Sequence, residues 1–370
     1  MIIIDFYKKW RKGCIFNECY KHAELFLQNY PQPRLSKDEK DEIDCFWAKY
    51  GIKWPDYSWF QMFYGVSGIK SPYYIPDPLA SKVLYPYYNN SSYIKGWDDK
   101  NLYERILPNV QFPNSLCHCI KNRLYDEQWT PIDNSDKSVY SLAKKIMDRK
   151  MSSDVIVKKT SKTNSGKGVK LYHIKTIDDL VKVIRTNISN NFIMQEKLVQ
   201  HPIMSKFCST SVNIIRIVSL RYGNDVLLFP ASVRFGTEGY VTDVSFIDGK
   251  ETVHVMGINK DGTVNGRLVS LDGRLEPKSQ IANITIPSFK SICDTIKTAH
   301  MHMYYFDLIG WDFAINEREE PICIEYNVIW PGTILYQYTN GPFCGNYTQQ
   351  FLEPLKTEML QRRIPAKYKL

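Results

Sequence analysis

The chain has 370 residues, 44% of them apolar, with nine cysteines and a formal net charge of +9. This composition is typical of a globular protein with roughly two or three packed units, and no run of about 20 apolar residues predicts a membrane-spanning helix. The scattered cysteines and the lack of a secretory signal predict a cytoplasmic protein without a disulfide framework or a zinc site. The charge suits anionic ligands such as nucleotides, but it forms no basic stripe for nucleic acid.

The first 95 residues are predicted to be helical and rich in aromatic side chains. Residues 20–28 and 37–50 have helical spacing, and Ser36 is an expected N-cap. Six aromatic residues crowd one segment: Trp47, Trp54, Trp59, Phe60, Phe63 and Tyr64. They could stack on a sugar or a base, but we favour a small aromatic core or a docking face for the next domain. Residues 70–95 are rich in Pro, Tyr, Asn and Ser, which predicts an irregular crossing segment.

From residue 96 onward the pattern predicts helices and strands. A short helix opens at residues 97–101 and ends before Pro108, and residues 136–149 form a helix with capping residues at 133–135. The expected single strands are 116–124, 154–160, 169–174, 191–199, 253–258 and 267–271. The expected hairpins join 211–221 with 226–234 and 310–316 with 321–327, and the later helices are 178–186, 287–304 and 349–362.

A short glycine loop lies between the strands 154–160 and 169–174. In it, Ser165, Gly166, Lys167 and Gly168 offer backbone N–H groups that can approach a phosphate closely, because glycine has no side chain in the way. Lys158 in the preceding strand adds positive charge. The loop is no P-loop, since the upstream glycine, the following Ser or Thr and the following helix are all missing. A basic surface turn is the alternative.

The strand 191–199 ends in four residues, Gln195, Glu196, Lys197 and Leu198, and leads to His201. The end of a strand can present backbone groups to the edge of an adenine and a carboxylate to a ribose. An ordinary strand end followed by proline is the alternative.

Arg216 and Arg234 belong to the hairpin 211–234, and arginine can clamp a phosphate or a carboxylate in a bidentate manner. A regular register pairs Arg234 with Asn213, which puts the two arginines on opposite faces. A bulge at Pro230 would reverse this. Spacing alone therefore leaves open whether both reach one site.

Asp312 and Glu325 are expected to face each other across the last hairpin. A four-residue turn pairs Asn316 with Pro321, which sets the two carboxylates opposite each other. Asn327 shares their face, because side chains alternate along a strand. Opposed carboxylates repel, whereas Mg²⁺ between them, or Mn²⁺ in its place, would be ligated and would leave room for phosphate oxygens. A hairpin with one charged, solvated face is the alternative.

Taken in this order, the segments resemble the ATP-grasp superfamily, and more closely the sugar-transfer-associated ATP-grasp family found with bacterial capsule and teichuronopeptide-type polysaccharide genes. The resemblance covers about residues 95–355 and is carried by residues 98–101, 155–158, 165–169, 195–197, 200–202, 211–216, 310–312 and 325–327.

The resemblance implies an α+β ATP-grasp fold, in which ATP lies between two α+β subdomains. The implied division is a helical, aromatic-rich N-terminal region (1–95), a preceding segment (96–150), a small subdomain with the glycine loop (151–200) and a core subdomain with the metal site (201–370). The implied ATP-binding residues are Lys158, Ser165, Gly166, Lys167, Gly168, Gln195, Glu196, Lys197, Leu198 and His201. The implied metal ligands are Asp312, Glu325 and Asn327, and the implied catalytic residues are Arg216, Arg234 and Lys167.

The resemblance also implies an ADP-forming carboxylate–amine ligase that uses ATP and Mg²⁺. It would join an amino acid or similar amine to a small or lipid-linked sugar carboxylate through an acyl phosphate, in surface polysaccharide synthesis, with peripheral association with membrane glycan machinery. The alternatives are a kinase of the same fold that phosphorylates a sugar hydroxyl, and a non-catalytic nucleotide-binding subunit. Two departures from the family pattern concern residues 241–249, where only Asp243 and Gly249 agree, and Lys159, where a proline is common.

Overall fold

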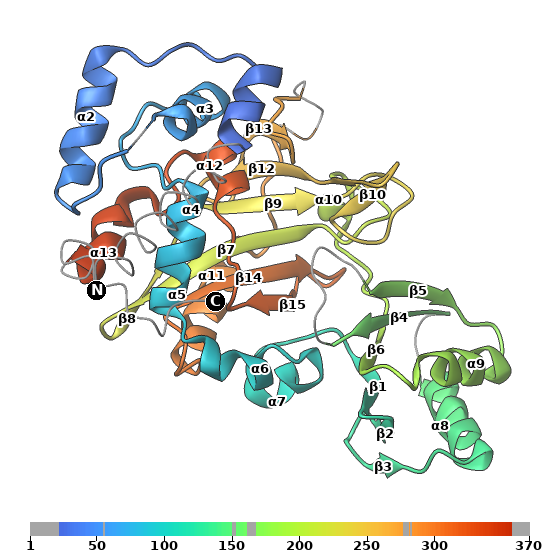
Figure 1. Ribbon diagram of the computed structural model, residues 1–370. Helices are drawn as coiled ribbons and strands as arrows, with labels where there is room; N and C mark the ends of the chain where they lie inside the picture. The colour runs from blue at the N-terminus through green and yellow to red at the C-terminus, as the bar shows by residue number, and fades with distance from the viewer. Residues whose placement is uncertain are drawn as a thin grey trace, which may run out of the picture.

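The computed structural model describes residues 22–54, 56–149, 153–160, 168–276, 281 and 283–356. Within this part of the chain, the strands form two large antiparallel sheets, which lie next to each other in Figure 1, and a separate two-stranded ribbon. Helices cover faces of both sheets. The architecture therefore has the predicted α+β class, with a helical region toward the N-terminus.

The smaller sheet has the strand order β3-β2-β1-β6-β4-β5. Its strands are β1 (Ser115–Ile120), β2 (Arg123–Asp126), β3 (Pro131–Ile132), β4 (Asp154–Lys159), β5 (Val169–His173) and β6 (Phe192–Glu196). Helices α8 (Asp136–Arg149) and α9 (Ile177–Asn187) pack on one face through an apolar cluster that includes Leu142 and Ile184. The boundaries of α8 are those predicted from the sequence.

The larger sheet has the order β13-β12-β9-β7-β14-β15, and β8 pairs with β7. Its strands are β7 (Ile214–Tyr222), β8 (Asp225–Leu228), β9 (Ala231–Phe235), β12 (His254–Ile258), β13 (Val264–Ser270), β14 (Leu308–Ile315) and β15 (Pro321–Asn327). Helix α11 (Phe289–Met301) covers one face, where Ile217 and Trp311 are buried. The ribbon of β10 (Ser245–Ile247) and β11 (Lys250–Thr252) lies beyond the end of β9 (Figure 1).

The other face of the larger sheet is apolar at one end and charged at the other. Val218 and Leu220 of β7 and Leu308 of β14 pack there against the N-terminal region and the C-terminal helices. Alternation along the strands puts Arg216 and Asp312 on this same face, beyond the apolar residues.

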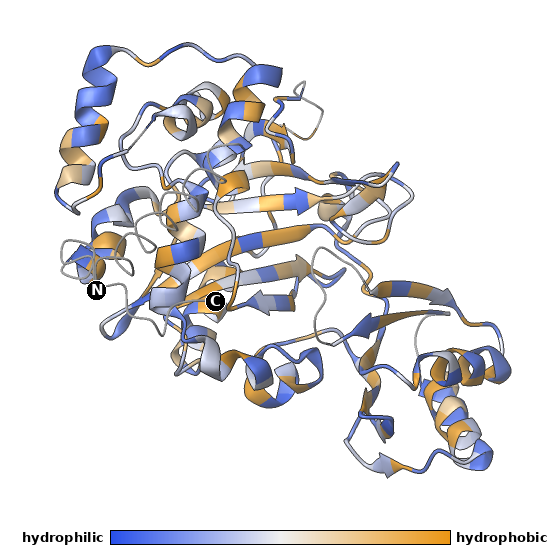
Figure 2. Ribbon diagram, in the orientation of Figure 1, coloured by the Kyte–Doolittle hydropathy of each residue, from blue (hydrophilic) through white to orange (hydrophobic). Residues whose placement is uncertain are grey.

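The N-terminal region forms an aromatic core against the larger sheet. Residues 22–29 are helical, followed by α2 (Lys37–Ala48) and α3 (Ser58–Ser67). Helix α2 is mostly hydrophilic in Figure 2, and its large apolar residues Ile43, Phe46 and Trp47 are buried. The six crowded aromatic residues are at most 7% exposed: Trp47, Trp54, Trp59, Phe60, Phe63 and Tyr64. Their burial confirms the core interpretation, since a ligand could not stack on them.

The segment 70–95 is more regular than predicted. Helix α4 (Asp77–Leu79), the π-helical turn η1 (Ala80–Leu84) and α5 (Tyr85–Tyr88) follow one another without a break. Pro86 lacks the N–H that an α-helix needs, and the wider π turn precedes it. Proline and asparagine predict a loop by propensity alone, but burial of this segment against the aromatic core decides the outcome.

Residues 116–124 form a hairpin and not the single strand expected. Lys121 and Asn122 have φ values of 50° and 61°, which make the two-residue turn that joins β1 to β2. The last predicted helix is also shorter than expected, since α13 (Thr348–Leu352) passes into a 3₁₀ turn and residues 357–362 lie outside the described part. The remaining short helices are η2 (Ser91–Tyr93), α6 (Ile94–Trp97), η3 (Lys100–Leu102), α7 (Tyr103–Ile106), α10 (Pro202–Ser205), α12 (Ile334–Asn340), η4 (Gly345–Tyr347) and η5 (Glu353–Leu355).

Among the described residues, no helix combines the length and the apolar character that crossing a membrane requires.

Asn89 joins the N-terminal region to the larger sheet, and we expect Asn89→Ala to destabilise the protein by about 3 kcal/mol. The side chain is 3% exposed, and its amide donates to the carbonyls of Leu308 and Val328 at 2.6 and 2.5 Å. Its oxygen accepts the N–H of Leu308 at 3.2 Å. Removing it leaves buried carbonyls without their donor. Urea unfolding measures the loss. The exposed Asn109→Ala is the control, and an equal effect of both changes would contradict this role.

Candidate active site

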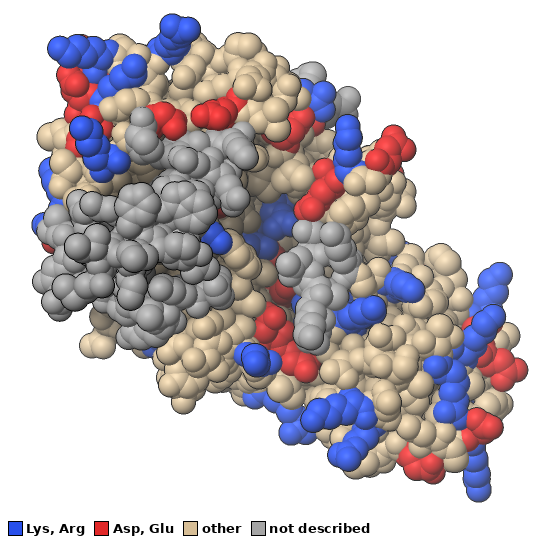
Figure 3. Space-filling model, viewed as in Figure 1, with Lys and Arg blue, Asp and Glu red and all other residues tan. Residues whose placement is uncertain are grey.

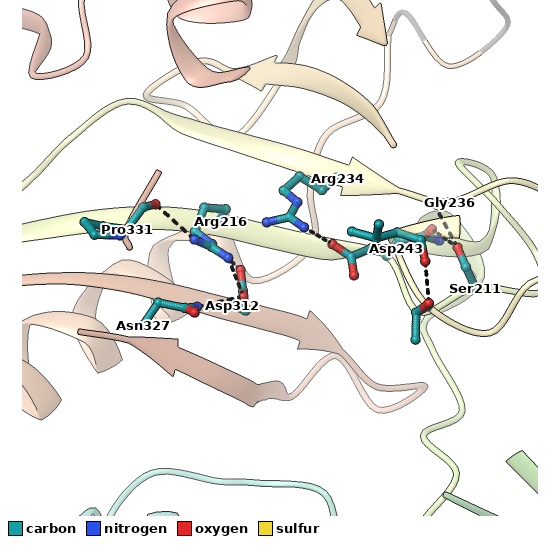
Figure 4. Close-up of polar contacts among 11 residues, drawn as sticks. Ser211, Arg216, Arg234, Gly236, Asp243, Asp312, Asn327 and Pro331 are labelled. Atoms are coloured by element: carbon teal, nitrogen blue, oxygen red, sulfur yellow. Dashed lines mark hydrogen bonds and ion pairs between the residues drawn. The ribbon is translucent and has the colours of Figure 1, made fainter. Parts of the chain in front are cut away.

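Charged side chains from four parts of the chain meet on the face of the larger sheet where the apolar cover ends. Figure 4 shows Arg216, Arg234, Asp243 and Asp312 along this face. In Figure 3, Lys or Arg side chains lie deep in a hollow in the middle of the view, with Asp or Glu side chains near them. The hollow lies over β7 and β9 of the larger sheet (Figures 1 and 3).

Arg216 on β7 and Asp312 on β14 are register partners and form a buried bidentate ion pair. Arg216 Nη2 donates to Asp312 Oδ2 at 2.7 Å, and Arg216 Nε donates to Oδ1. Burial opposes the charged guanidinium, but the attraction of Asp312 outweighs it and raises the pKa of Arg216. Arg216 Nη1 donates to the Pro331 carbonyl at 3.0 Å, and Asn327 Nδ2 donates to Asp312 Oδ2 at 3.2 Å (Figure 4).

Asp312 and Glu325 lie opposite each other, as predicted, although the strands β14 and β15 pair differently from the prediction near the turn. Ile315, and not Asn316, pairs with Pro321, so the register at the turn was wrong by one residue. A β-bulge at Ile324 inserts one residue into β15 and restores the pairing of Asp312 with Glu325. The structure thus brings together the three residues expected to bind a metal.

Arg234 lies on the same face as Arg216, which answers the question that the sequence left open. Strands β7 and β9 pair Arg216 with Ser232 and Ile214 with Arg234. The pairing of β7 with β8 and the pairing of β7 with β9 differ in register by one residue. The chain therefore has the bulge that Pro230 suggested. Both guanidinium groups therefore reach one site.

Asp243 holds an irregular loop against the site through Arg234. Arg234 Nη2 lies 2.6 Å from Asp243 Oδ2, and the two side chains are 14% and 18% exposed. Burial opposes the charge of Arg234, but Asp243 outweighs it and the pKa of Arg234 is raised. Burial also raises the pKa of Asp243, against the attraction of Arg234. Ser211 Oγ accepts the N–H of Gly236 at 3.2 Å and fixes the start of the same loop (Figure 4).

Two lysines approach Glu325 from the side of the smaller sheet. Lys100 Nζ donates to Glu325 Oε1 at 3.3 Å, and the backbone N–H of Lys100 donates to the carbonyl of Thr160 at 3.3 Å. Lys100 therefore links β15 to the end of β4. Burial lowers the pKa of Lys158 to about 8, although Glu325 raises it in part. A small pocket beside them is lined by Lys100, Tyr103, Glu104, Phe112, Lys158, Gln195 and Ile324.

The end of β6 is fixed by the segment before β1. Gln195 Nε2 donates to the Pro113 carbonyl at 3.1 Å, and Glu196 Oε2 accepts from Asn114 Nδ2 at 2.9 Å. Within the described chain, Gln195 Oε1 is buried without a hydrogen-bond partner. Leu198 is partly exposed. Gln195 and Glu196 are the last two residues of β6, and Gln195 lines the same small pocket as Lys158.

Lys197 and His201 have structural partners of their own. Lys197 Nζ donates to Asp154 Oδ2 at 3.1 Å. His201 is the N-cap of α10, where its Nδ1 accepts the backbone N–H of Ile203 at 3.2 Å, and its Nε2 lies 3.4 Å from Glu319 Oε1. The structure thus places His201 beside the turn of the β14–β15 hairpin.

Three residues of the glycine loop, Ser165, Gly166 and Lys167, lie outside the described residues. Gly168, which follows them, has a φ of 92°, and its carbonyl accepts the N–H of Lys159 at 3.1 Å. This positive φ is one that glycine adopts without strain. No group of three or more His, Cys, Asp and Glu side chains with metal-binding spacing occurs among the residues that the structure describes.

The sequence did not indicate three contacts of the site: Lys100 with Glu325, Asp243 with Arg234, and the Pro331 carbonyl with Arg216. The pairs are separated by 225, nine and 115 residues along the chain. The segments 98–101 and 241–249 stood out only through the family resemblance. No local pattern could have paired them, because each contact depends on the tertiary fold.

The sequence model of the family described as sugar-transfer-associated ATP-grasp matches residues 79–351. The comparison with curated proteins found no match.

Several solved structures are similar in fold at low sequence identity. N5-carboxyaminoimidazole synthetase from Staphylococcus aureus, complexed with ADP, is 11% identical with a TM-score of 0.37, and the match covers 62% of this chain and 44% of that one. VanG D-Ala:D-Ser ligase from Enterococcus faecalis is 12% identical with a TM-score of 0.44, covering 70% and 61%. D-alanyl-alanine synthetase A from Vibrio cholerae is 14% identical with a TM-score of 0.43, covering 78% and 67%. The chain thus spans 44% and 61% of the first two proteins.

The lowered pKa of Lys158 predicts a pH dependence of stability. Between pH about 8 and 10.5, the unfolded lysine binds a proton that the folded one has lost, so the free energy of unfolding rises with pH across this window. We expect the difference in free energy of unfolding between wild type and Lys158→Met to rise by about 1–3 kcal/mol across this pH window. Urea unfolding at several pH values measures it. For the exposed neighbour, the difference in free energy of unfolding between wild type and Lys159→Met should not change with pH. A difference that also stays constant for Lys158→Met would contradict the lowered pKa of Lys158.

Proposed function

Because the chain belongs to the sugar-transfer-associated ATP-grasp family, we propose that it is an ATP-dependent carboxylate–amine ligase that releases ADP. In this proposal it joins an amino acid or a similar amine to a carboxylated sugar or glycan precursor. The pathway would be the synthesis of a bacterial surface polysaccharide such as a capsule, with the enzyme in the cytoplasm.

The opposition of Asp312 and Glu325 across β14 and β15 carries the proposal. Each carboxylate already has one cationic partner, Arg216 or Lys100. A carboxylate offers about four acceptor positions, so both keep free positions for a metal. Together with the oxygen of Asn327, this all-oxygen donor set fits Mg²⁺. Bound there, Mg²⁺ would neutralise negative charge on the phosphates of ATP.

The nucleotide would lie between the two sheets. Lys158 and the glycine loop of residues 165–168 would bind the phosphates, with Lys167 reaching the transferred group. The end of β6, from Gln195 to Leu198, would line the adenine and ribose, and His201 would border this subsite. The partly buried position of Lys158 supports this, because a cation in low dielectric binds phosphate more strongly than one in water.

Arg216 and Arg234 would bind the substrate carboxylate and the phosphoryl group that it receives. One carboxylate oxygen attacks the γ-phosphorus of ATP, the bond to the bridging oxygen breaks, and ADP leaves. The amine then attacks the acyl carbon, loses a proton, and expels inorganic phosphate. The arginines stay charged through both steps, because their raised pKa values keep the proton on the guanidinium. The loop from Gly236 to Asp243 would keep water from the acyl phosphate.

The acyl phosphate can be tested by isotope transfer. A panel of uronic acids labelled with ¹⁸O in the carboxylate is incubated with ATP, Mg²⁺ and amino acids, and mass spectrometry follows phosphate, nucleotide and amide. One ¹⁸O in the released phosphate, ADP and not AMP, and a new amide are expected. A stable phosphorylated sugar formed without an amine would instead identify a kinase.

Glu325→Gln should lower kcat by about 10²–10³-fold, because the variant keeps the shape of the side chain but loses the charge that holds the metal. The fold should remain, since Glu325 is partly exposed. The exposed Glu317→Gln, on the turn of the same hairpin, is the matched control and should keep wild-type activity. If Glu325→Gln kept wild-type activity, or still restored function in cells that lack the wild-type protein, the chain would instead be a non-catalytic nucleotide-binding subunit.

A further inference from the structure

Residues 328–333 link β15 to α12 and form one edge of the site. Three hydrogen bonds fix this edge segment: Asn89 Nδ2 to the Val328 carbonyl (2.5 Å), Arg216 Nη1 to the Pro331 carbonyl (3.0 Å) and Thr333 Oγ1 to Asp77 Oδ1 (3.1 Å). Close packing adds to these bonds, because a Cβ on Gly310 of β14 would lie 3.0 Å from the Cα of Pro331. Two of the three anchors belong to the N-terminal region. That region therefore shapes the edge of the site.

Trp330 lies in the middle of this edge segment and is 45% exposed. The tryptophans of the aromatic core and Trp311 are at most 3% exposed. Tyr85 of α5 packs at 88° to the indole of Trp330, with the ring centroids 6.0 Å apart. The ring is thus held by a fixed backbone and an aromatic neighbour while a large part of it stays accessible. A rigid, accessible indole beside a polar site is suited to stacking on a ligand.

The groups around Trp330 suit a polyhydroxylated, carboxylated ligand. Asp77 at the start of α4 is partly exposed and can accept hydrogen bonds from hydroxyl groups, while the buried hydroxyl of Thr333 donates to its Oδ1. Tyr336 follows in the chain and touches Gly332, since a Cβ there would lie 3.0 Å from its ring. Tyr336 also helps to raise the pKa of Arg234, so it lies close to that guanidinium. The edge segment therefore connects an aromatic surface to the cations proposed to bind a carboxylate.

We propose that Trp330 is the platform on which the pyranose ring of a uronic-acid-type substrate stacks, with the sugar carboxylate directed to Arg234. This rests on the proposed function, in which a sugar carboxylate is the group that is activated. The C–H groups on one face of a pyranose carry partial positive charge and pack on the negative face of an aromatic ring. A nucleobase is disfavoured there, because the base of ATP is assigned to the end of β6, on the smaller sheet.

Binding of simple uronides without ATP tests the platform. The probes are the methyl glycosides of glucuronic, galacturonic and mannuronic acid, measured by NMR titration and saturation-transfer difference. We expect at least one to bind wild type, with the strongest transfer to protons of one ring face. Trp330→Ala should weaken binding by about tenfold and Trp330→Phe by less than about threefold, since the phenyl ring still stacks. Tyr304→Ala is the control, because Tyr304 is 69% exposed just after α11.

Two results would overturn the platform. They are no binding of any uronide to wild type, and equal binding of the uronides to wild type and to Trp330→Ala. Thermal unfolding of Trp330→Ala should match wild type, which separates a lost platform from a lost fold. Uronide binding through Trp330 without ATP-dependent amide formation would refute the ligase and keep the platform. Amide formation from a uronide, with the same KM for the uronide in wild type and Trp330→Ala, would support the ligase and refute the platform.

Discussion

Two opposed carboxylates set the electrostatic constraint on which this site depends. Unit charges about 4 Å apart repel by roughly 4 kcal/mol at an effective dielectric constant near 20, so Asp312 and Glu325 need compensating cations even without a metal. The fold supplies one to each, Arg216 from the adjacent strand and Lys100 from the segment that precedes the smaller sheet. Arg216 belongs to the larger sheet, whereas Lys100 is also hydrogen-bonded to Thr160 at the end of β4 in the smaller sheet. The ion pairs that neutralise this hairpin therefore also join the two sheets. The stability of the fold and the geometry of the site thus rest on the same charges.

Local patterns predicted much of the fold and less of the site. Apolar periodicity and capping residues were sufficient for α8 and for most strands of both sheets, and the family match confirms the predicted ATP-grasp class. Bulges were the main obstacle. The pairing of Asp312 with Glu325 was right although the turn register was not, because the extra residue Ile324 cancels the error. The face of Arg234 stayed open for the same reason, since one inserted residue reverses the direction of every side chain that follows.

Contacts between distant segments lay beyond the sequence. Lys100 meets Glu325 across 225 residues, and nothing within a strand or a helix specifies such a partner. The segment 77–88 shows the converse case, in which tertiary burial overrides propensity and makes a helix from a sequence with the composition of a loop. Sequence patterns report what a residue does to its own element, whereas the site is assembled by the packing of elements on one another.

The anchors of the edge segment bear on what the smallest complete unit of this protein is. A fragment that began at residue 96 would retain every residue assigned here to ATP and to the metal. It would lack Asn89 and Asp77, so the backbone of residues 328–333 would lose two of its three attachments. We expect such a fragment to retain nucleotide binding, whereas the edge segment, on which we propose that the sugar stacks, would be held less firmly. The N-terminal region would then influence which sugar binds, although none of its described residues, 22–54 and 56–95, is assigned a role in the chemistry.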